Sequence, residues 1–496
     1  MPPPVTEHDD IQALVKTGYG GLTEARYLLV TIRDRDGARA WLADMRPTSV
    51  GDLKERRSAA FQIAVTAAGL RALGVDEAAV RGFSAEFVSG LSGDEARSRR
   101  LGDVGDSAPA RWAWGGAREP HLLIMLFAED GGLDALRRQV ETPTFAGAFE
   151  VLELTTSDMH GREPFGFLDG LSQPVMDWDG ERKPGGAADF DYTNLVAAGE
   201  FLLGYANEYG RLTERPLIEP AADPGGRLPA AVDDPERRDL GRNGSYLVFR
   251  QLDQDVRGFW RFVRSHAPPD KVVALAETMV GRKMDGEPIL SPHRKPIPGV
   301  GPNSDDLRRN GFTYDLDRHG LVCPIGAHIR RANPRTGDMP GGNQGLIKRL
   351  VGMLGLLGGD PRADVIATTR FHRIMRRGRE YGSFLEPALA GEPGAPDPQS
   401  GLNFICLNAN IGRQFEFIQS AWLTSAKFGG LSGEADPLLG SRAPHPPGQP
   451  TDAMTVPQAD GPCRHIDGLP RFVSVRGGAY FFLPGLRALR WMAGAR

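Results

Sequence analysis

The chain has 496 residues, of which 40% are hydrophobic and 25% charged, as is usual for a soluble globular protein. Its formal net charge of -4 argues against general nucleic-acid binding, which favours a concentrated basic face. Three widely spaced cysteines form neither a disulfide framework nor a CxxC metal site, so a reducing compartment is expected. No apolar run reaches the ~18 residues of a membrane span and no secretory signal pattern opens the sequence, so we expect a cytoplasmic protein without membrane contact.

The first part of the chain alternates apolar and amphipathic segments. An apolar run from Tyr27 gives way to a charged amphipathic segment, which predicts a strand, a helix cap and a helix. Helices are also expected near "GLRALG" and "LDALRRQV", and further strands at residues 61–67, 121–128 and 149–154. This βαββαβ order predicts a ferredoxin-like unit.

A second stretch resembles the first. The run from Tyr246 also begins Tyr-Leu, and Trp41 and Trp260 share an offset from their tyrosines, as do Asp36 and Asp255. Strands are expected at residues 245–251, 402–408 and 472–483, before a closing helix at "LRALRWM". We therefore expect an α+β fold of duplicated ferredoxin-like units, with antiparallel sheets and peripheral helices, like a dimeric α/β-barrel.

This duplication predicts three parts of the chain. Residues 1–160 form the N-terminal ferredoxin-like unit. Residues 161–244 hold the segment "GFLDG" and a connecting region, and residues 245–496 form the C-terminal unit with long insertions.

One acidic residue, Asp169, stands between two glycines in "GREPFGFLDGLSQP". Glycines allow a tight turn and a close approach of a ligand. An acid in aromatic surroundings tends to have a raised pKa, which suits a proton-handling group in a pocket. The alternative is an N-cap for a helix that begins near Leu171.

His328 lies between small apolar residues and two arginines in "CPIGAHIRRANPR". Such an imidazole can be an axial ligand of haem iron, and nearby arginines can neutralise the haem propionates. His372 competes for this role, and a hydrogen-bonded structural histidine is the alternative. The sequence has no CxxCH motif, so a haem would be bound non-covalently.

Two further segments carry candidate site residues. Arg376 belongs to a run of four arginines within seven residues, which is either a solvated surface or supplies a charge-stabilising group to a pocket. The segment from residue 401 to 422 predicts a strand followed by a helix, with Leu402 and Phe404 on one face of the strand. Glu416 follows among aromatic residues and needs a partner, such as the second N–H of a histidine ligand.

The segments "GFLDG", "CPIGAHIRRANPR", "IMRRG…YG" and "GLNF" occur together and in order, and with them the chain resembles the larger bacterial dye-decolourising peroxidases. The opening "DIQALVKTGYG" and the closing "FVSVRGGAYFFLPGLRAL" extend the resemblance over nearly the whole chain. It implies a peroxidase with non-covalent haem b that reduces hydrogen peroxide and oxidises dyes or phenols through a ferryl intermediate. The rival functions are haem binding or delivery, and release of iron from haem, with little peroxidase turnover.

The resemblance also implies roles for individual residues. His328 would be the proximal iron ligand, Asp169 the distal acid-base residue and Arg376 its partner. Leu402 and Phe404 would form the wall of the distal pocket.

Arg330 is expected to contact a propionate, and Glu416 is expected to be the carboxylate partner of His328. The sequence departs from the family pattern beside Arg376, so Arg373 and Arg377 are alternatives for the distal arginine. The expected partners are hydrogen peroxide and small organic electron donors, with homo-oligomer formation left open. Bulky dyes would give electrons at the surface through an aromatic residue, unless the candidates, Trp422 and Tyr381, only pack in the core.

Overall fold

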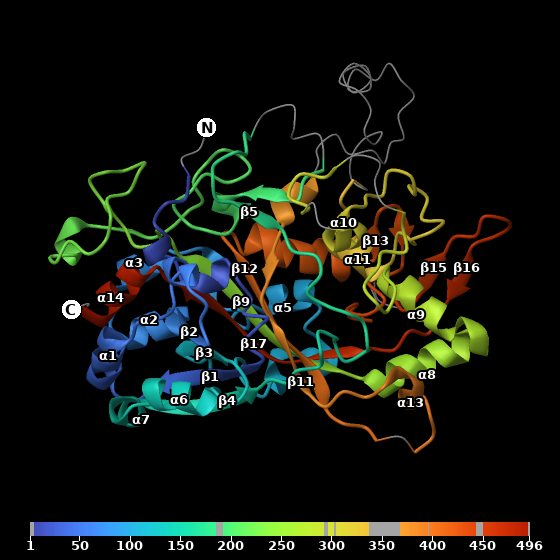
Figure 1. Cartoon of the computed structure of the whole chain (residues 1–496), viewed down its shortest axis with the longest axis horizontal. Helices are drawn as coiled ribbons and strands as arrows, with labels where there is room; N and C mark the ends of the chain where they lie inside the picture. The colour runs from blue at the N-terminus through green and yellow to red at the C-terminus, as the bar shows by residue number, and fades with distance from the viewer. Residues whose placement is uncertain are drawn as a thin grey trace.

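The computed structural model describes residues 4–184, 192–291, 296–301, 304–336, 368–394, 396–442 and 450–494. A nine-stranded sheet runs through both halves of the chain in the order β10-β12-β9-β17-β2-β3-β1-β4, with β11 also paired with β12 (Figure 1). Its paired strands are antiparallel throughout. Within the described ranges, no helix combines the length and apolar character needed to cross a bilayer.

The first half of the chain has the predicted βαββαβ order. Its elements are β1 (Glu24–Ile32), α1 (Arg35–Asp44), β2 (Ala59–Val65), β3 (Leu122–Ala128), α6 (Leu133–Val140) and β4 (Phe149–Thr155). The strands lie in the order β2-β3-β1-β4, so the two helical connections bring β1 and β3 to the centre of this unit. The prediction of a ferredoxin-like unit is confirmed.

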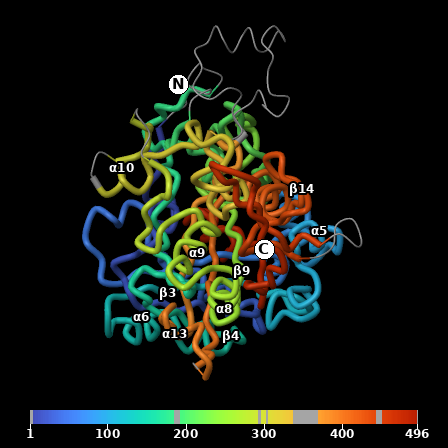
Figure 2. The backbone as a smooth tube through the Cα atoms, turned by 90° about the vertical axis from the view of Figure 1, so that its right-hand side faces the viewer, coloured from blue at the N-terminus to red at the C-terminus, as the bar shows by residue number. Residues whose placement is uncertain are grey.

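The second half repeats this arrangement with longer insertions. Its elements are β9 (Ser245–Gln254), α8 (Val256–His266), β10 (Met375–Arg376), β11 (Arg379–Gly382), β12 (Ser400–Asn408), β17 (Val473–Leu483) and α14 (Leu486–Gly494). β10 and β11 stand where β2 stands in the first unit, and the sequence did not indicate either of them. Figures 1 and 2 show α8 beside α9 (Val272–Val280), and the two helices contact each other.

The two units share one sheet and have matching buried tryptophans. β17 pairs with β2 through Phe482 and Val65, which makes the sheet continuous. Trp41 and Trp260 are 0% and 1% exposed, so their matching offsets reflect matching core positions.

The helix caps of the two units do not match in the same way. Asp34, and not Asp36, caps α1 by accepting the N–H of Asp36. Asp255 caps α8 by accepting the N–H of Gly258. The shared offset of Asp36 and Asp255 is therefore not a shared role.

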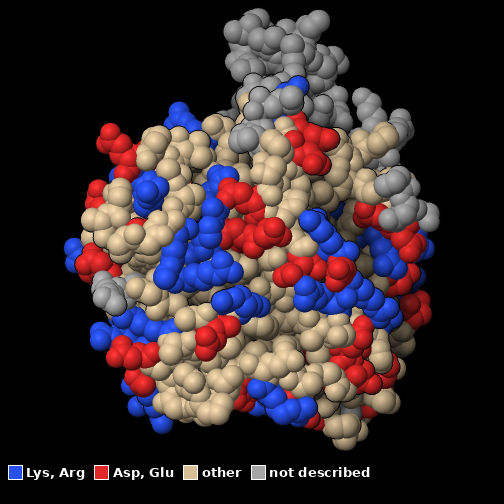
Figure 3. Space-filling view, turned by 60° about the vertical axis from the view of Figure 1, so that its left-hand side comes forward, with Lys and Arg blue, Asp and Glu red and all other residues tan. Residues whose placement is uncertain are grey.

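The sheet has an apolar core on each face because successive side chains of a strand point to opposite sides. In β12, Leu402 and Phe404 pack with the core that contains Trp41, whereas Ile405 and Leu407 belong to the core on the opposite face. The candidate site lies on the Leu402 side, in the second unit. On the outer face shown in Figure 3, basic and acidic side chains lie in adjacent small groups.

Candidate active site

His328 is the first residue of α11 (His328–Ala332), and its imidazole is bound to a buried carboxylate. Its Nδ1 lies 3.0 Å from Oδ2 of Asp436, which is fully buried. A carboxylate only accepts hydrogen bonds, so Nδ1 carries the proton and Nε2 is left as a potential metal ligand. Burial lowers the pKa of His328, but the charge of Asp436 outweighs burial and raises it.

Asp436 is itself held by the turn that follows it. Its Oδ1 accepts the backbone N–H groups of Leu438 and Leu439 at 2.9 and 2.8 Å. Burial raises the pKa of Asp436, but His328 and the backbone donors outweigh burial and keep the pKa below its ordinary value. The only sequence signal for this residue is an Asp-Pro pair of the kind that begins turns.

Glu416 is not the partner of His328, and that prediction is wrong. It ends the helical turn η11 (Gly412–Glu416), which directs its carboxylate towards β17 and α5 (Glu95–Leu101). There it accepts the hydroxyl of Tyr480 at 2.9 Å and forms an ion pair with Arg97 at 2.8 Å.

Asp169 and Arg376 form the second pair of the site. Arg376 is on β10, and its Nη1 donates to Oδ1 of Asp169 at 2.9 Å. Burial raises the pKa of Asp169, but the charge of Arg376 and the N–H of Gly170 outweigh burial and lower it. The expectation of a raised pKa is therefore wrong, because the aromatic surroundings are offset by this arginine.

The helix-cap alternative for Asp169 is also wrong. No helix begins near Leu171 in the described chain, and the next element is β5 (Val175–Asp177). Instead, Asp169 ends a tight loop with Gly166 at φ 101° and Gly170 at φ 74°. A Cβ on Gly166 would lie 2.6 Å from Cγ of Pro387, so both the backbone angle and the close packing require glycine there.

The other arginines of the same run point elsewhere. Arg377 donates to the backbone oxygen of Leu14 at 2.7 Å. Arg373 donates to Oδ1 of Asn194 at 2.7 Å. Of the three candidates, Arg376 is therefore the one that faces Asp169.

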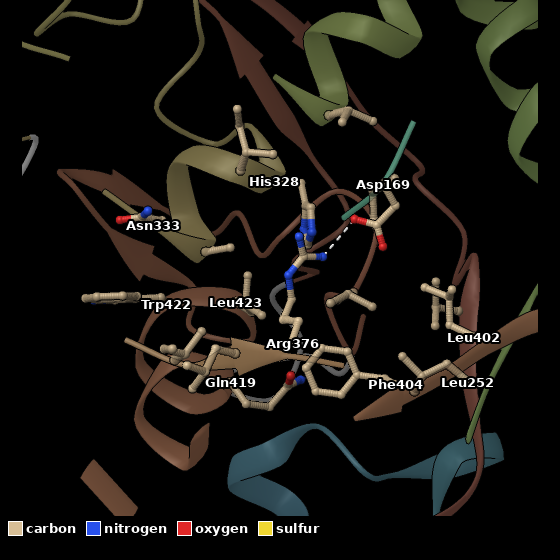
Figure 4. Close-up of a pocket in the computed structure, with 18 of the residues that line it drawn as sticks. Asp169, Leu252, His328, Asn333, Arg376, Leu402, Phe404, Gln419, Trp422 and Leu423 are labelled. Carbon is tan, nitrogen blue, oxygen red and sulfur yellow. Dashed lines mark hydrogen bonds and ion pairs between the residues drawn. The ribbon is translucent and has the colours of Figure 1, made fainter. Parts of the chain in front are cut away.

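His328, Asp169 and Arg376 line one cavity of about 300 Å³, whereas Asp436 is not among its lining residues (Figure 4). Asp169, His328 and Arg376 lie close together, and Leu402, Phe404 and Leu252 form a neighbouring apolar wall. These apolar side chains come from β12 and β9, so the sheet itself supplies this wall. The volume is at the lower end of the roughly 300–1,000 Å³ typical of cofactor and ligand sites.

Five further arginines line the cavity. Arg250 forms an ion pair with Asp103, and Arg471 donates to Oγ of Ser107. The other three are Arg282, Arg335 and Arg373. They are 7%, 3% and 5% exposed, and none forms an ion pair with a carboxylate of the described chain. Burial lowers the pKa of Arg282 to about 10, which shows how far it is withdrawn from water. Buried cations of this kind are suited to the carboxylates of a bound ligand.

Arg330 does not line this cavity, so its predicted propionate contact is wrong. Its guanidinium donates to the backbone oxygen of Cys323 at 2.6 Å and to Oδ2 of Asp317 at 3.2 Å. It therefore holds the loop before α11 in place and is not part of the cavity lining.

The remaining aromatic candidates are interior residues. Trp422 and Tyr381 are both 8% exposed, as core packing requires. His372 lines the cavity, but its ring is stacked on Phe417 at 3.6 Å and its Nδ1 bonds the backbone oxygen of Arg413. Burial lowers its pKa to about 4, and its hydrogen-bond partner is a carbonyl and not a carboxylate.

Relatives of this chain are peroxidases. No family model matches it. The multifunctional dye peroxidase DyP2 of Amycolatopsis sp. (strain ATCC 39116 / 75iv2) is 30% identical, over 95% of this chain and 90% of that protein. The dye-decolorizing peroxidase msp1 of Mycetinis scorodonius is 28% identical, over 87% of this chain and 76% of that protein. The crystal structure of a DyP-type peroxidase from Auricularia auricula-judae has a TM-score of 0.69 and 25% identity, over 98% of this chain and 99% of that one.

The duplicated ferredoxin-like sheet and these relatives define the class of the protein, which is a haem-dependent peroxidase. Within that class, the chain belongs to the dye-decolorizing peroxidase family. The fold, the enzyme class and the family resemblance expected from the sequence are confirmed.

Proposed function

We propose that the chain reduces hydrogen peroxide and oxidises dyes or phenolic donors, with haem b bound non-covalently in the cavity. The observation that carries this proposal is that His328, whose ring is bonded to Asp436, lines the same cavity as the Asp169–Arg376 pair. The first pair is suited to ligate iron, and the second is suited to move a proton next to it.

The residues around the cavity fit a haem. Nε2 of His328 would bind the iron, and Arg282, Arg335 and Arg373 would hold the two propionates. Leu402 and Phe404 would contact the apolar ring. None of the cysteines 323, 406 and 463 lines the described cavity, which supports non-covalent binding. When bound, haem would supply the redox chemistry that cleaves the O–O bond of peroxide.

The protein groups handle the proton and the charge. Asp169 is ionised at neutral pH because its pKa is lowered, so it can take a proton from one peroxide oxygen and return it to the other. Arg376 fixes the carboxylate and stabilises negative charge that develops on the departing oxygen. Asp436 keeps the proton on Nδ1 of His328 and makes Nε2 a stronger ligand.

The test is an ultraviolet-visible spectrum of haem-loaded protein before and after one equivalent of peroxide. We expect a rapid change of the haem bands that a phenol or dye then reverses. Haem that stays bound with an unchanged spectrum would favour a haem-binding or delivery function. Metal-free porphyrin after anaerobic incubation would favour iron release. The cytoplasmic location and the oligomeric state remain predictions.

A further inference from the structure

The loop that ends in Asp169 contains a second buried carboxyl group, Glu163, which has no role in the steps above. Its Oε2 accepts the backbone N–H of Phe165 and its Oε1 accepts that of Phe167, each at 3.0 Å. Gln254, the last residue of β9, donates its side-chain amide to Oε2 at 2.8 Å. One carboxylate therefore receives two bonds from the loop and one from the central sheet.

The backbone of the loop closes around this carboxylate. The N–H of Glu163 donates to the oxygen of Phe167 at 2.9 Å, and the N–H of Gly166 donates to the oxygen of Glu163 at 2.8 Å. The N–H of Asp169 donates to the oxygen of Gly161 at 2.8 Å, which joins the two ends of the loop. The position of Asp169 therefore depends on the shape of the short segment that Glu163 organises.

Glu163 also shares the cavity with Asp169 and Gln254. Burial raises the pKa of Glu163 to about 7, and the nearby charge of Asp169 raises it as well. Oε1 of Gln254, a residue 8% exposed, has no hydrogen-bond partner among the described residues. Keeping a carboxylate in so buried a place is unfavourable, so its three hydrogen bonds are needed to hold it there.

We propose that Glu163 is a positioning residue for Asp169, holding the loop in the shape that directs Asp169 towards Arg376. It acts through the amides of Phe165 and Phe167 and ties the loop to β9 through Gln254. This inference rests on the proposed function, because it concerns the geometry of the acid-base residue.

The first variant is Glu163→Gln. An amide of the same size accepts at only one atom, so it cannot accept both loop N–H groups at separate oxygens as the carboxylate does. In the haem-free protein we expect faster hydrogen exchange of the peptide that covers residues 161–170. This readout does not depend on haem or on turnover.

The second readout is cyanide binding by the haem-loaded protein, followed by its absorbance. Hydrogen cyanide must lose a proton as it binds, and Asp169 is the base that would accept it. We expect Glu163→Gln to slow association by about tenfold, a fraction of the roughly 10²–10⁴-fold contribution of a positioned base. The pH at which the cyanide association rate falls to half on the acidic side should rise, because Asp169 moves away from the positive charge of Arg376. This pH is called the acidic midpoint.

That midpoint depends on every charged group that acts on Asp169. Besides Glu163, these groups are Arg376, Arg282, His328 and Glu380. None of these four side chains is changed in the variants. Glu163 has a pKa of about 7 and is protonated at the acidic midpoint, so its replacement removes no charge there and a raised midpoint reports on the position of Asp169.

The swapped variant Glu163→Gln/Gln254→Glu tests whether the position of the carboxyl group matters. It keeps one carboxyl group and one amide in the pair but leaves the loop with a single amide acceptor. Glu119→Gln is the matched control, since Glu119 is another buried acid with a pKa raised to about 7 that does not line the described cavity. We expect no recovery in the swap and no change in the control.

The inference would be overturned if Glu163→Gln showed the same hydrogen exchange of residues 161–170 as the wild type. The cyanide association rate and its pH midpoint would also have to be unchanged. Full recovery in the swap would overturn it too, because a carboxyl group at either position would then be sufficient. If Glu163→Gln fails to fold, Gln254→Leu can be used, because it removes only the hydrogen bond between Glu163 and β9. It should change the hydrogen exchange and the cyanide association rate in the same direction but by less. No change in either measurement would refute the positioning role of Glu163. If the haem-loaded wild-type protein did not react with peroxide, the proposed function would be refuted instead. The hydrogen-exchange result on the haem-free protein would remain valid.

Discussion

The carboxylate of Asp169 and the guanidinium of Arg376 lie 2.9 Å apart, although 207 positions separate them in the chain. Two different structural elements position these residues. A glycine-bounded loop presents Asp169, and the pairing of β10 with β12 presents Arg376 opposite Cys406. The acid-base pair therefore forms only when the second unit is assembled.

Replacing Asp169 with asparagine should slow the reaction with peroxide by roughly 10²–10⁴-fold, because the proton acceptor is lost while the shape is kept. The measurement is stopped-flow absorbance of the haem-loaded protein from pH 3 to 8. The variant should also lose the acidic limb of the wild-type pH profile. An unchanged rate and profile would mean that Asp169 has only a structural role in its loop.

Replacing Arg376 with leucine should slow the same step by about 10²–10³-fold, as for the loss of one charge-stabilising donor. Asp169 would then lose the positive charge that lowers its pKa, so the acidic limb should persist and move to higher pH. Arg379→Leu is the control, because this arginine of the same run donates to the backbone oxygen of Tyr19. Equal effects of the two variants would contradict the assignment.

The ligand pair can be tested by haem affinity. His328→Ala should abolish most haem binding or leave a weakly held haem with altered bands, because the iron loses its protein ligand. Asp436→Asn should weaken binding by roughly 10–100-fold, as is typical when the partner of a metal-bound histidine is changed.

Glu416→Gln is the matched comparison for Asp436→Asn. Glu416 contacts Tyr480 and Arg97 and not His328, so haem affinity should stay at the wild-type level. Loss of affinity in Glu416→Gln with retention in Asp436→Asn would instead make Glu416 the carboxylate on which haem binding depends.

Glu119 should make the haem-free protein less stable at pH 8 than at pH 5. Burial raises the pKa of Glu119 from 4.5 to about 7, so its favourable contribution is complete below pH 4.5 and is lost as the pH rises through 7. Glutamine does not titrate. The difference between the melting temperatures of Glu119→Gln and the wild type should therefore shift in favour of the variant by about 1–3 °C from pH 5 to pH 8. A constant difference across this range would show that Glu119 is not held in its protonated form.

The sequence predicted most of the fold because the strands of both units are long and apolar. β10 and β11 were missed because they are short and rich in arginine, and only their pairing with β12 defines them as strands. The division of the chain at residues 160 and 244 remains a prediction.

The candidate site was predicted where a residue stands in a recognisable motif. Asp169, His328 and Arg376 are in such motifs, and the structure brings them to one cavity. Asp436 is not, because it follows β14 (Leu431–Ser432) in a segment without a recognisable motif, and nothing in that segment points to His328, which lies 108 positions earlier.

Arg330 and Glu416 were assigned wrongly for a related reason. Each lies in a short helical segment, where neighbouring residues point in different directions and sequence spacing alone does not tell which one faces the ligand.

Asp436 gives the site a property that belongs to the haem-free chain. One of its oxygens closes a turn of the backbone, and the other fixes the imidazole of His328. The ligand is thus preorganised, and the rotational freedom of its ring is lost during folding and not during cofactor capture. Loading should then be limited by the arrival of haem rather than by rearrangement of its ligand.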